Sequence, residues 1–224
     1  MKLGFLTTSY RRQLLDRDLM MATDGLEGLV LDLGGEKERR GSFRLPQRDE
    51  LQWLCINIDS LEWPEILATV EHVPLRDGCA DVVVCTEVLE HVPEAFPVIC
   101  ESYRLLRCGG LLIISMPFLY HVHADPYDYQ RYTATKLMNL LVETGFEGIE
   151  IKAQGYYFTV MADMVRDGLN QFRSRVVRWP LAFFVLPLIR LMIYMDSQPW
   201  VRSSPRLSSY TTGYFVQARK SRNN

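Results

Sequence analysis

The sequence lacks several features that mark particular classes of protein. A net charge of −2 gives no general attraction to nucleic acid. The five cysteines contain no CxxC pair, and Cys55 and Cys85 lie within apolar runs, so we expect buried thiols rather than disulfides. Only a brief apolar patch precedes Arg11-Arg12, which argues against a signal peptide. These absences favour a reducing, cytoplasmic setting.

Uninterrupted hydrophobic runs of membrane-spanning length are also lacking. Residues 181–195 have 13 apolar residues of 15, but Pro187 and Arg190 break the run, and a bilayer span needs roughly 18–20 apolar residues. The remaining composition is ordinary for a globular protein, with 48% hydrophobic and 23% charged residues. A chain of 224 residues is long enough for one domain with a substantial core.

The most informative stretch is Ala80–Pro117. Two short apolar runs, Val82–Cys85 and Leu111–Ile114, are typical of strands buried on both faces of a parallel sheet. Between them, apolar side chains recur at the spacing of one helix face: Phe96, Ile99, Tyr103 and Leu106. The stretch therefore predicts a strand–helix–strand crossover, and such units bind ligands at the carboxyl ends of their strands.

This stretch resembles the second half of a class I S-adenosylmethionine-dependent methyltransferase of the type 11 group. The residues that carry the resemblance are Asp81-Val82-Val83, Glu87-Val88-Leu89-Glu90-His91-Val92, Arg104-Leu105-Leu106 and Gly109-Gly110. The resemblance covers roughly residues 25–155. It implies an α/β fold with a mostly parallel seven-stranded sheet and an antiparallel last strand, S-adenosylmethionine as cofactor, and methyl transfer as the reaction.

The rest of the chain can be divided around this core. We expect a helical extension at 1–24, the Rossmann-like core at 25–155, a helical cap or insertion at 156–209, and the last strand with a tail at 210–224. The early helices should be abbreviated, because 41–50 contain Gly41 and Pro46 without a long apolar stripe. The expected strands are 28–33, 53–59, 66–69, 146–153 and 213–220, with a helix over Thr133–Gly145.

The resemblance places the cofactor's amino acid part at the end of the first strand. There Asp32, Gly34 and Gly35 match the family pattern, in which the aspartate helps to hold the amino group. The family continues with two more glycines, whereas this chain has Glu36 and Glu38, which would repel the cofactor carboxylate. Lys37, Arg39 and Arg40 offset that repulsion if the glutamates point outward.

The nucleoside part of the cofactor is expected at the next strands. Asp59 is suited to bind both ribose hydroxyls, although an aspartate in a solvated turn is the alternative. Thr69 stands where the family usually has an aspartate that accepts from the adenine amino group, and Val70 offers a backbone N–H. Thr86, at the end of the following strand, completes the predicted cofactor residues.

The methyl acceptor is expected at a polar, aromatic loop, Pro117–Thr133. His121 and His123 are the predicted general bases, and the predicted acceptor-binding residues are Tyr120, Asp125, Asp128, Tyr129 and Arg131. The arginine fork suits an anionic acceptor. The loop resembles that of type 11 members tied to sugar or lipid modification. The alternative is a loop held together by tyrosine hydroxyls and aspartate caps.

A metal ion is the less favoured expectation. Glu87, Glu90 and His91 resemble the E-x-x-E-H element that holds Mg²⁺ in some ubiquinone-pathway and small-RNA methyltransferases, and His121 or His123 would complete the set. Because many type 11 members share the motif without a metal, we expect none, with Glu87 capping backbone and His91 packed.

The insertion before the last strand has a distinct pattern of charged and apolar residues. Residues 173–206 contain six arginines and one acid, Asp196, with Trp179 and Trp200 near the margins of the apolar run. This pattern suits either a peripheral membrane contact or a helical cap that covers the core or a homodimer partner.

Taken together, the residues favour an S-adenosylmethionine-dependent methyltransferase acting on a small-molecule, sugar or lipid-linked acceptor. The alternative is a degenerate methyltransferase-fold protein that serves as a binding or regulatory subunit. A nucleic-acid substrate has little support, and a dehydrogenase is disfavoured because the GxGxxG order is absent.

Overall fold

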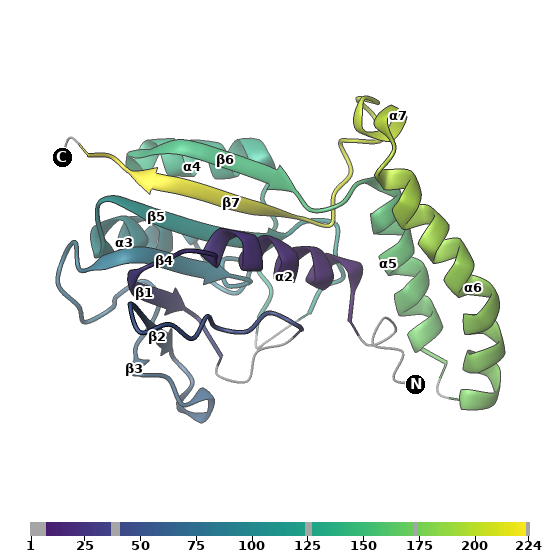
Figure 1. Cartoon of the computed structure of the whole chain (residues 1–224), viewed down its shortest axis with the longest axis horizontal. Coiled ribbons are helices and arrows are strands. Elements are labelled where there is room, and N and C mark those ends of the chain that lie inside the picture. Colours follow the sequence, from purple (N-terminus) through teal and green to yellow (C-terminus); the bar gives the residue numbers. More distant parts are fainter. Residues whose placement is uncertain (1–7, 37–40, 124–126, 173, 223–224) are drawn as a thin grey trace.

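The computed structural model describes residues 8–36, 41–123, 127–172 and 174–222, and its centre is one seven-stranded sheet (Figure 1). The strand order is β3-β2-β1-β4-β5-β7-β6, in which only the pairs β5–β7 and β7–β6 are antiparallel. The strands are β1 Gly28–Leu33, β2 Leu51–Asn57, β3 Ile66–Leu67, β4 Ala80–Thr86, β5 Leu106–Pro117, β6 Phe146–Ala153 and β7 Gly213–Lys220. The predicted mostly parallel sheet with an antiparallel last strand is confirmed.

The central strands are buried on both faces because alternate side chains enter different clusters. In β4, Val83 and Cys85 belong to the larger core, which contains helices α3 Ala95–Leu105 and α4 Ala134–Thr144. Val82 and Val84 face the other way, into a smaller core with Leu15 and Leu19 of helix α2 Tyr10–Thr23. Helices α3 and α4 therefore cover one face of the sheet and α2 covers the other (Figure 1).

Local capping fixes the helices that flank the core. Thr133 accepts a hydrogen bond from Lys136 N at the start of α4, and Gly145 ends that helix in the left-handed region with φ 101°. The predicted helix Thr133–Gly145 is confirmed with both of its caps. All five cysteines, each within the described residues, are thiols, and Cys55 and Cys85 are buried as expected.

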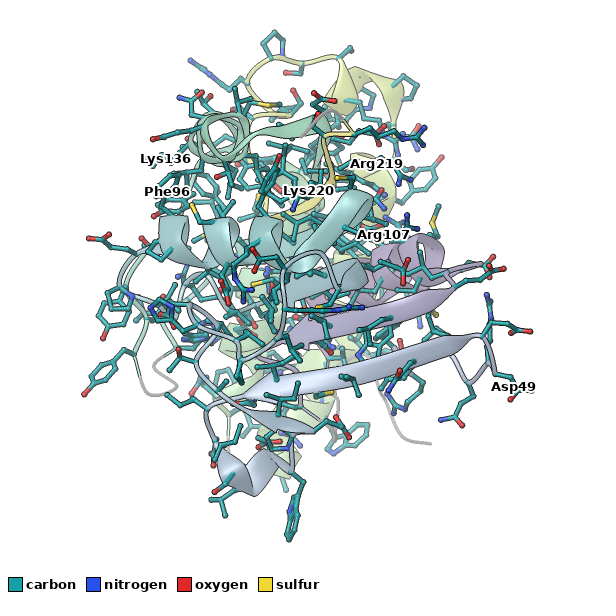
Figure 2. All side chains as sticks on the ribbon, turned by 90° about the vertical axis from the view of Figure 1, so that its left-hand side faces the viewer. Asp49, Phe96, Arg107, Lys136, Arg219 and Lys220 are labelled. Atoms are coloured by element: carbon teal, nitrogen blue, oxygen red, sulfur yellow. The ribbon has the colours of Figure 1, made fainter. Side chains whose placement is uncertain are left out.

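Several predictions about the elements are wrong in detail, including the start of β2, which is Leu51 and not Trp53, and the end of β3, which is Leu67 and not Thr69. Phe96 lies at the surface rather than on the buried face of α3 (Figure 2), since the buried stripe is Ala95, Val98, Ile99, Ser102 and Leu105. Leu106 is not helical but begins β5. Strand β2 ends at Asn57 and not at Asp59, because Asp59 accepts from Leu61 N and caps a short 3-10 helix, η1 Ser60–Glu62.

The first part of the sheet has few helices of its own. Residues 41–50 are described without a helix, and only η1 lies between β2 and β3. Phe43, 1% exposed, packs from the 41–50 loop into the smaller core and replaces part of the missing helical cover. The predicted abbreviation of the early helices is confirmed over these residues.

A helical arm connects β6 to β7. It consists of α5 Tyr157–Asn170, α6 Arg175–Asp196 and α7 Pro199–Arg202, and it extends beyond the carboxyl ends of β1, β4 and β5 (Figure 1). Asp196 at the end of α6 accepts from the backbone N–H groups of Tyr156, Phe158 and Thr159, so it caps the start of α5 and closes the arm on itself.

Candidate active site at the carboxyl edge of the sheet

The turn after β1 needs glycine at both of its first positions. Gly34 has φ 74°, and a Cβ there would collide with the side chain of Val88. A Cβ on Gly35 would lie 2.6 Å from the carboxylate carbon of Asp32. Asp32 itself is 1% exposed and accepts from the indole Nε1 of Trp53 at 3.1 Å. The backbone therefore passes very close to a buried carboxylate, as at a ligand-binding turn.

Of the two glutamates that stand in place of the family's glycines after this turn, the structure describes only Glu36. Glu36 has a half-buried side chain, whereas Lys37, Glu38, Arg39 and Arg40 lie outside the described residues. The predicted offset of the two glutamates therefore stays a prediction. A contact that the sequence did not reveal supports the turn from the next strand, since Asn57 Nδ2 donates to the carbonyl of Gly35 at 3.1 Å.

The predicted nucleoside residues lie along the same edge and differ in exposure. Asp59 and Thr69 are exposed, and Asp59 already caps η1. Thr69 forms a backbone bridge with His72, while Val70 is buried. Thr86 is half-buried at the end of β4. All four follow strands whose carboxyl ends meet at one edge, which is where an extended ligand would lie.

An ion pair between buried Arg11 of α2 and half-buried Glu87, directly after β4, crosses this edge. The guanidinium of Arg11 binds both carboxylate oxygens of Glu87, and its Nη2 lies 2.5 Å from Oε1. Ser115 of β5 donates to the same Oε1 at 2.6 Å. Burial alone would raise the pKa of Glu87, but the charge and hydrogen bonds of Arg11 lower it below its usual value. Glu87 also has φ 59°, a strained backbone that is often found at functional sites.

Arg11 is held in place from three sides. Its backbone N–H and that of Tyr10 donate to the carboxylate of Asp163 on α5, at 3.0 and 2.7 Å. Its guanidinium lies 5.2 Å from the ring centre of Tyr120 in the acceptor loop. The start of α2 thus joins the arm to the carboxyl edge, and no sequence pattern indicated this connection.

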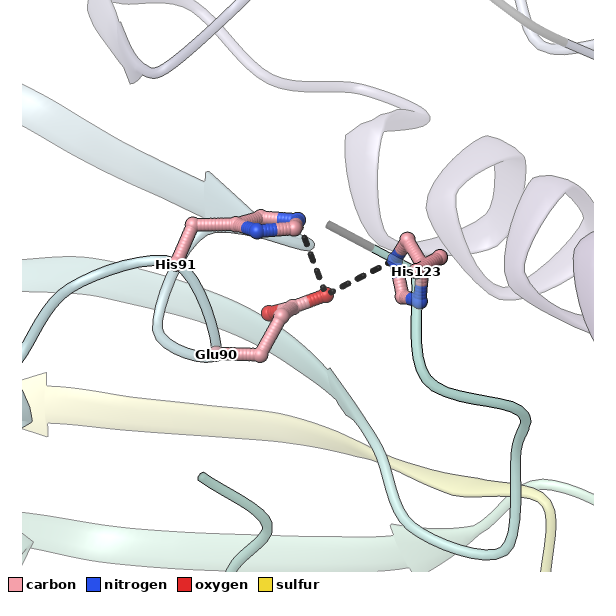
Figure 3. Close-up of side chains that lie close together, drawn as sticks. All are labelled: Glu90, His91 and His123. Atoms are coloured by element: carbon pink, nitrogen blue, oxygen red, sulfur yellow. Dashed lines mark ion pairs between the residues drawn. The ribbon is translucent and has the colours of Figure 1, made fainter. Parts of the chain in front are cut away.

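Glu90, His91 and His123 form a second cluster (Figure 3), and the charges of Glu87 and Arg11 act on its Glu90. Oε1 of Glu90 is 3.8 Å from His91 Nε2 and 4.0 Å from His123 Nε2. The two imidazole rings stand edge to face with centres 5.2 Å apart. Nδ1 of His91 lies 2.5 Å from the carbonyl oxygen of Tyr127, which fixes that ring. Side chains from two separate loops therefore point at one carboxylate.

The electrostatics of the cluster are unusual because Glu90 is 0% exposed. Neither of its carboxylate oxygens has a hydrogen-bond partner among the described residues. Burial and the nearby charge of Glu87 raise the pKa of Glu90 to about 8. Burial also lowers the pKa of His123. An uncharged imidazole therefore faces a carboxyl group that holds its proton at neutral pH.

The cluster corrects the predicted metal set. The favoured expectation was no metal, with Glu87 capping backbone, but its carboxylate binds the side chains of Arg11 and Ser115 instead, so Glu87 also drops out of the less favoured ligand set of Glu87, Glu90 and His91. The ligand atoms that gather within 4.8 Å of one another are those of Glu90, His91 and His123. A tetrahedral ion with bonds of about 2.0–2.2 Å would need ligand atoms about 3.4 Å apart, so a small inward movement would suffice.

Some of the remaining residues of the acceptor loop are held by hydrogen bonds and ion pairs, and others are exposed to solvent. His121 is exposed, with Nδ1 3.9 Å from Asp167 of α5, while Tyr129 is half exposed. Asp128 accepts from the backbone N–H of His123 at 3.0 Å and forms a two-point ion pair with Arg131, whose hydrogen bonds lower the pKa of Asp128. Arg131 is thus already engaged, so an anionic acceptor would compete with Asp128. Asp125 lies outside the described residues.

The strand order and the placement of these groups define a Rossmann-like fold of the class I methyltransferase type. Known proteins agree. Residues 44–114 match the sequence model of the methyltransferase domain family. Over 81 residues the chain is 33% identical to a probable S-adenosylmethionine-dependent methyltransferase of Mycolicibacterium smegmatis, covering 34% of this chain and 32% of that protein.

Two further comparisons extend this picture. The chain is 30% identical over 98 residues to a ubiquinone biosynthesis O-methyltransferase of Psychrobacter cryohalolentis, covering 42% of this chain and 34% of that protein. A solved SAM-dependent methyltransferase from Archaeoglobus fulgidus has the same fold, with a TM-score of 0.57, 16% identity and coverage of 93% and 94% of the two chains. The aligned segments span about a third of the length of the curated relatives. The predicted resemblance to class I S-adenosylmethionine-dependent methyltransferases is confirmed.

Proposed function

We propose that this protein transfers a methyl group from S-adenosylmethionine to an oxygen or nitrogen atom of a small-molecule, sugar or lipid-linked acceptor. The observation that carries the proposal is the pairing, along one sheet edge, of a two-glycine turn beside buried Asp32 with the polar cluster of Glu90, His91 and His123. The family resemblance supports the same reading.

Cofactor binding would rest on the first three strands. The turn at Gly34 and Gly35 brings backbone close to Asp32, where a carboxylate and N–H groups suit the amino acid part of the cofactor. Asp59 would bind the ribose hydroxyls, and Thr69 and Val70 would contact the base, with Thr86 completing the site. When bound, S-adenosylmethionine supplies a methyl group on a positively charged sulfur, so orientation and exclusion of water carry much of the rate.

The acceptor's proton would be taken by His123 in preference to His121. Burial lowers the pKa of His123, so its ring is neutral and able to accept a proton, and Asp128 holds its backbone. His121 is mostly exposed and contacts the arm instead. For a hydroxyl acceptor, the O–H proton would pass to the imidazole as the new carbon–oxygen bond forms and the carbon–sulfur bond breaks.

A divalent ion fits the same cluster. With the proton of Glu90 released on binding, its carboxylate and the imidazoles of His91 and His123 form a mixed oxygen and nitrogen set, which suits Zn²⁺, Mn²⁺ or Fe²⁺ better than Mg²⁺. Such an ion would polarise the acceptor oxygen as a Lewis acid. His123 would then be a ligand rather than the base, so the two roles exclude each other.

A degenerate subunit is the second candidate, and Glu36 together with exposed Thr69 favours it. Calorimetry with S-adenosylmethionine and S-adenosylhomocysteine separates the two. We expect the parent protein to bind both, and Gly35→Ala to lose binding because its Cβ would collide with Asp32. Gly168→Ala is the matched control, because a Cβ on that helical residue meets nothing within 4 Å. A parent protein that binds neither compound would be a binding or regulatory subunit instead.

A further inference from the structure

Helix α6 exposes an extensive apolar surface. Most of its large apolar side chains are open to solvent, and Phe183 and Phe184 are 73% and 75% exposed. Val176, Leu188, Leu191 and Tyr194 add to the same surface. Only 11% of the helix's most apolar 18-residue window is buried within the protein. Extensive exposed apolar faces mark contact with a partner or a membrane.

The opposite side of α6 accounts for its packing inside the protein. Ala182 and Ile189, seven residues apart on one helix face, are 1% and 0% exposed, and α5 is the helix that packs against α6. Asp196 lies on the same side and caps α5. The helix therefore has one stripe that holds it to the arm and a wider apolar face that the protein does not cover.

By length and composition, Val176–Asp196 qualifies as a membrane-crossing helix. The fold excludes a crossing, however, because the preceding strand β6 and the following strand β7 are hydrogen-bonded neighbours in one sheet. A single crossing would place them on opposite sides of the bilayer. Helix α5 provides no return crossing, since it carries Asp163, Arg166 and Asp167 over only 14 residues. The helix can therefore lie along a membrane surface but not through it.

The charges of the arm indicate which kind of membrane surface α6 would bind. Residues 173–206 contain six arginines and a single acid, and that acid, Asp196, is 6% exposed and bound to backbone N–H groups. Among the arginines of 173–206 whose side chains the structure describes, Arg190, Arg202 and Arg206 are exposed. The outside of the arm is therefore positive beside an apolar face, although the whole chain has a net charge of −2. An anionic lipid surface complements both properties.

We infer that α6 docks the protein on an anionic lipid membrane, with its outward face, centred on Phe183 and Phe184, embedded among the headgroups. A second copy of the chain fits less well, because apposed arms would bring their arginines together. The helix is about 33 Å long at 1.5 Å per residue, so it defines a line of contact along the bilayer.

Docking would also orient the candidate active site. Asp167 of α5 lies 3.9 Å from His121, and Asp163 of α5 binds the start of α2, which carries Arg11 into the site. Helix α5 thus adjoins the acceptor loop and separates it from α6, so docking of the outward face of α6 fixes how the loop is oriented relative to the membrane. Provided that the proposed methyl transfer is correct, the acceptor belongs to the lipid-borne class.

Flotation with vesicles tests the docking without any reference to activity. The parent protein should float with vesicles of phosphatidylcholine and phosphatidylglycerol mixed two to one, and much less with phosphatidylcholine alone. Phe183→Ser/Phe184→Ser should reduce binding by about 10²-fold, because two exposed aromatic rings leave the lipid. Arg202→Gln/Arg206→Gln should weaken binding to the anionic vesicles only.

The control is Met21→Ser/Val142→Ser, which removes two apolar side chains of α2 and α4 that are 69% and 59% exposed, and it should bind as the parent does. Thermal unfolding should confirm that all variants are folded. A parent protein that stays unbound on anionic vesicles at low salt would overturn the inference. A stable dimer that Phe183→Ser/Phe184→Ser converts to monomer would overturn it as well and make this face a dimer interface. Calorimetry with S-adenosylmethionine tests the proposed function separately, so either can fail alone.

Discussion

The two halves of the carboxyl edge are built differently. The proposed cofactor half, formed by β1, β2, β3 and their loops, buries Asp32 but otherwise has exposed polar residues such as Asp59 and Thr69, with little helical cover among the described residues. The acceptor half, formed by β4, β5, the start of α2 and α5, buries its charges: Arg11, Glu90 and Asp163 are 3%, 0% and 4% exposed. Substitutions should therefore affect binding in the first half and folding as well as chemistry in the second.

The largest effect is expected in the acceptor half. Arg11→Ala leaves Glu87 without its charged partner, and breaking a buried pair costs about 3–5 kcal/mol of unfolding free energy. Denaturant unfolding measures it. Arg48→Ala is the control, since its partner Asp24 is largely exposed and such surface pairs contribute about 0–1 kcal/mol. Equal losses in the two variants would mean that the Arg11–Glu87 pair contributes no more than a surface pair.

The next effect separates two histidines of the same loop. His123→Ala should lower turnover by roughly 10²-fold while cofactor affinity stays near that of the parent, because the half-buried ring of His123 is the proposed base. His121→Ala should change turnover less, as that ring is exposed. Turnover with saturating cofactor is the measurement. If both variants retain parental turnover, catalysis would depend on positioning alone.

A smaller effect is expected in the cofactor half. Asp59→Ala should weaken S-adenosylmethionine binding by about 1–3 kcal/mol through the loss of a charged acceptor, with little change in stability, since Asp59 is exposed. Calorimetry measures the affinity. Asp49→Ala is the control, because Asp49 is exposed and precedes the amino end of β2, whereas the site lies at the carboxyl ends of the strands. Equal affinities in the two variants would leave Asp59 only its capping role.

The smallest effect concerns the candidate ion. If Glu90, His91 and His123 bind Mn²⁺ or Zn²⁺, a tenfold excess over Kd should stabilise the folded protein by about 1.4 kcal/mol. His91→Ala should abolish the shift, whereas His72→Ala, exposed and outside the cluster, should retain it. Thermal unfolding with and without the ion measures the difference. Activity and stability that are both unchanged in excess EDTA would remove the metal from the site.

The contrast between local and long-range contacts explains which features could be predicted from the sequence. Strand patterns and the capped helix at Thr133–Gly145 are local signals, and both were predicted, as was the two-glycine turn. The Arg11–Glu87 pair joins residues 76 positions apart, and Arg11 had no pattern of its own, so tertiary packing alone reveals it. The face of α3 was misplaced because Phe96 and Tyr103 have helical spacing without being the most buried residues.

Burial was the quantity that sequence reasoning could not supply for the candidate site. Glu90 and His91 were singled out by their motif, and His123 by its loop, but nothing local indicated that Glu87 would turn away toward α2 while Glu90 turned inward. The position of α2 decides that Arg11 pairs with Glu87. That position depends on the hydrogen bonds from the start of α2 to Asp163 of α5, a helix far away in the sequence.

The junction of the arm with the sheet has a consequence for how the chain folds. Gln154 N donates to the carbonyl of Gly213 and Thr212 N donates to that of Gln154, so the two ends of the arm meet across a single pair of strands. In topology, β6 and β7 form an antiparallel β-hairpin in which three helices, α5, α6 and α7, replace the connecting loop. Because the entropy cost of closing a loop rises only slowly with its length, such a connection can be gained, exchanged or trimmed with little penalty to the register of the sheet.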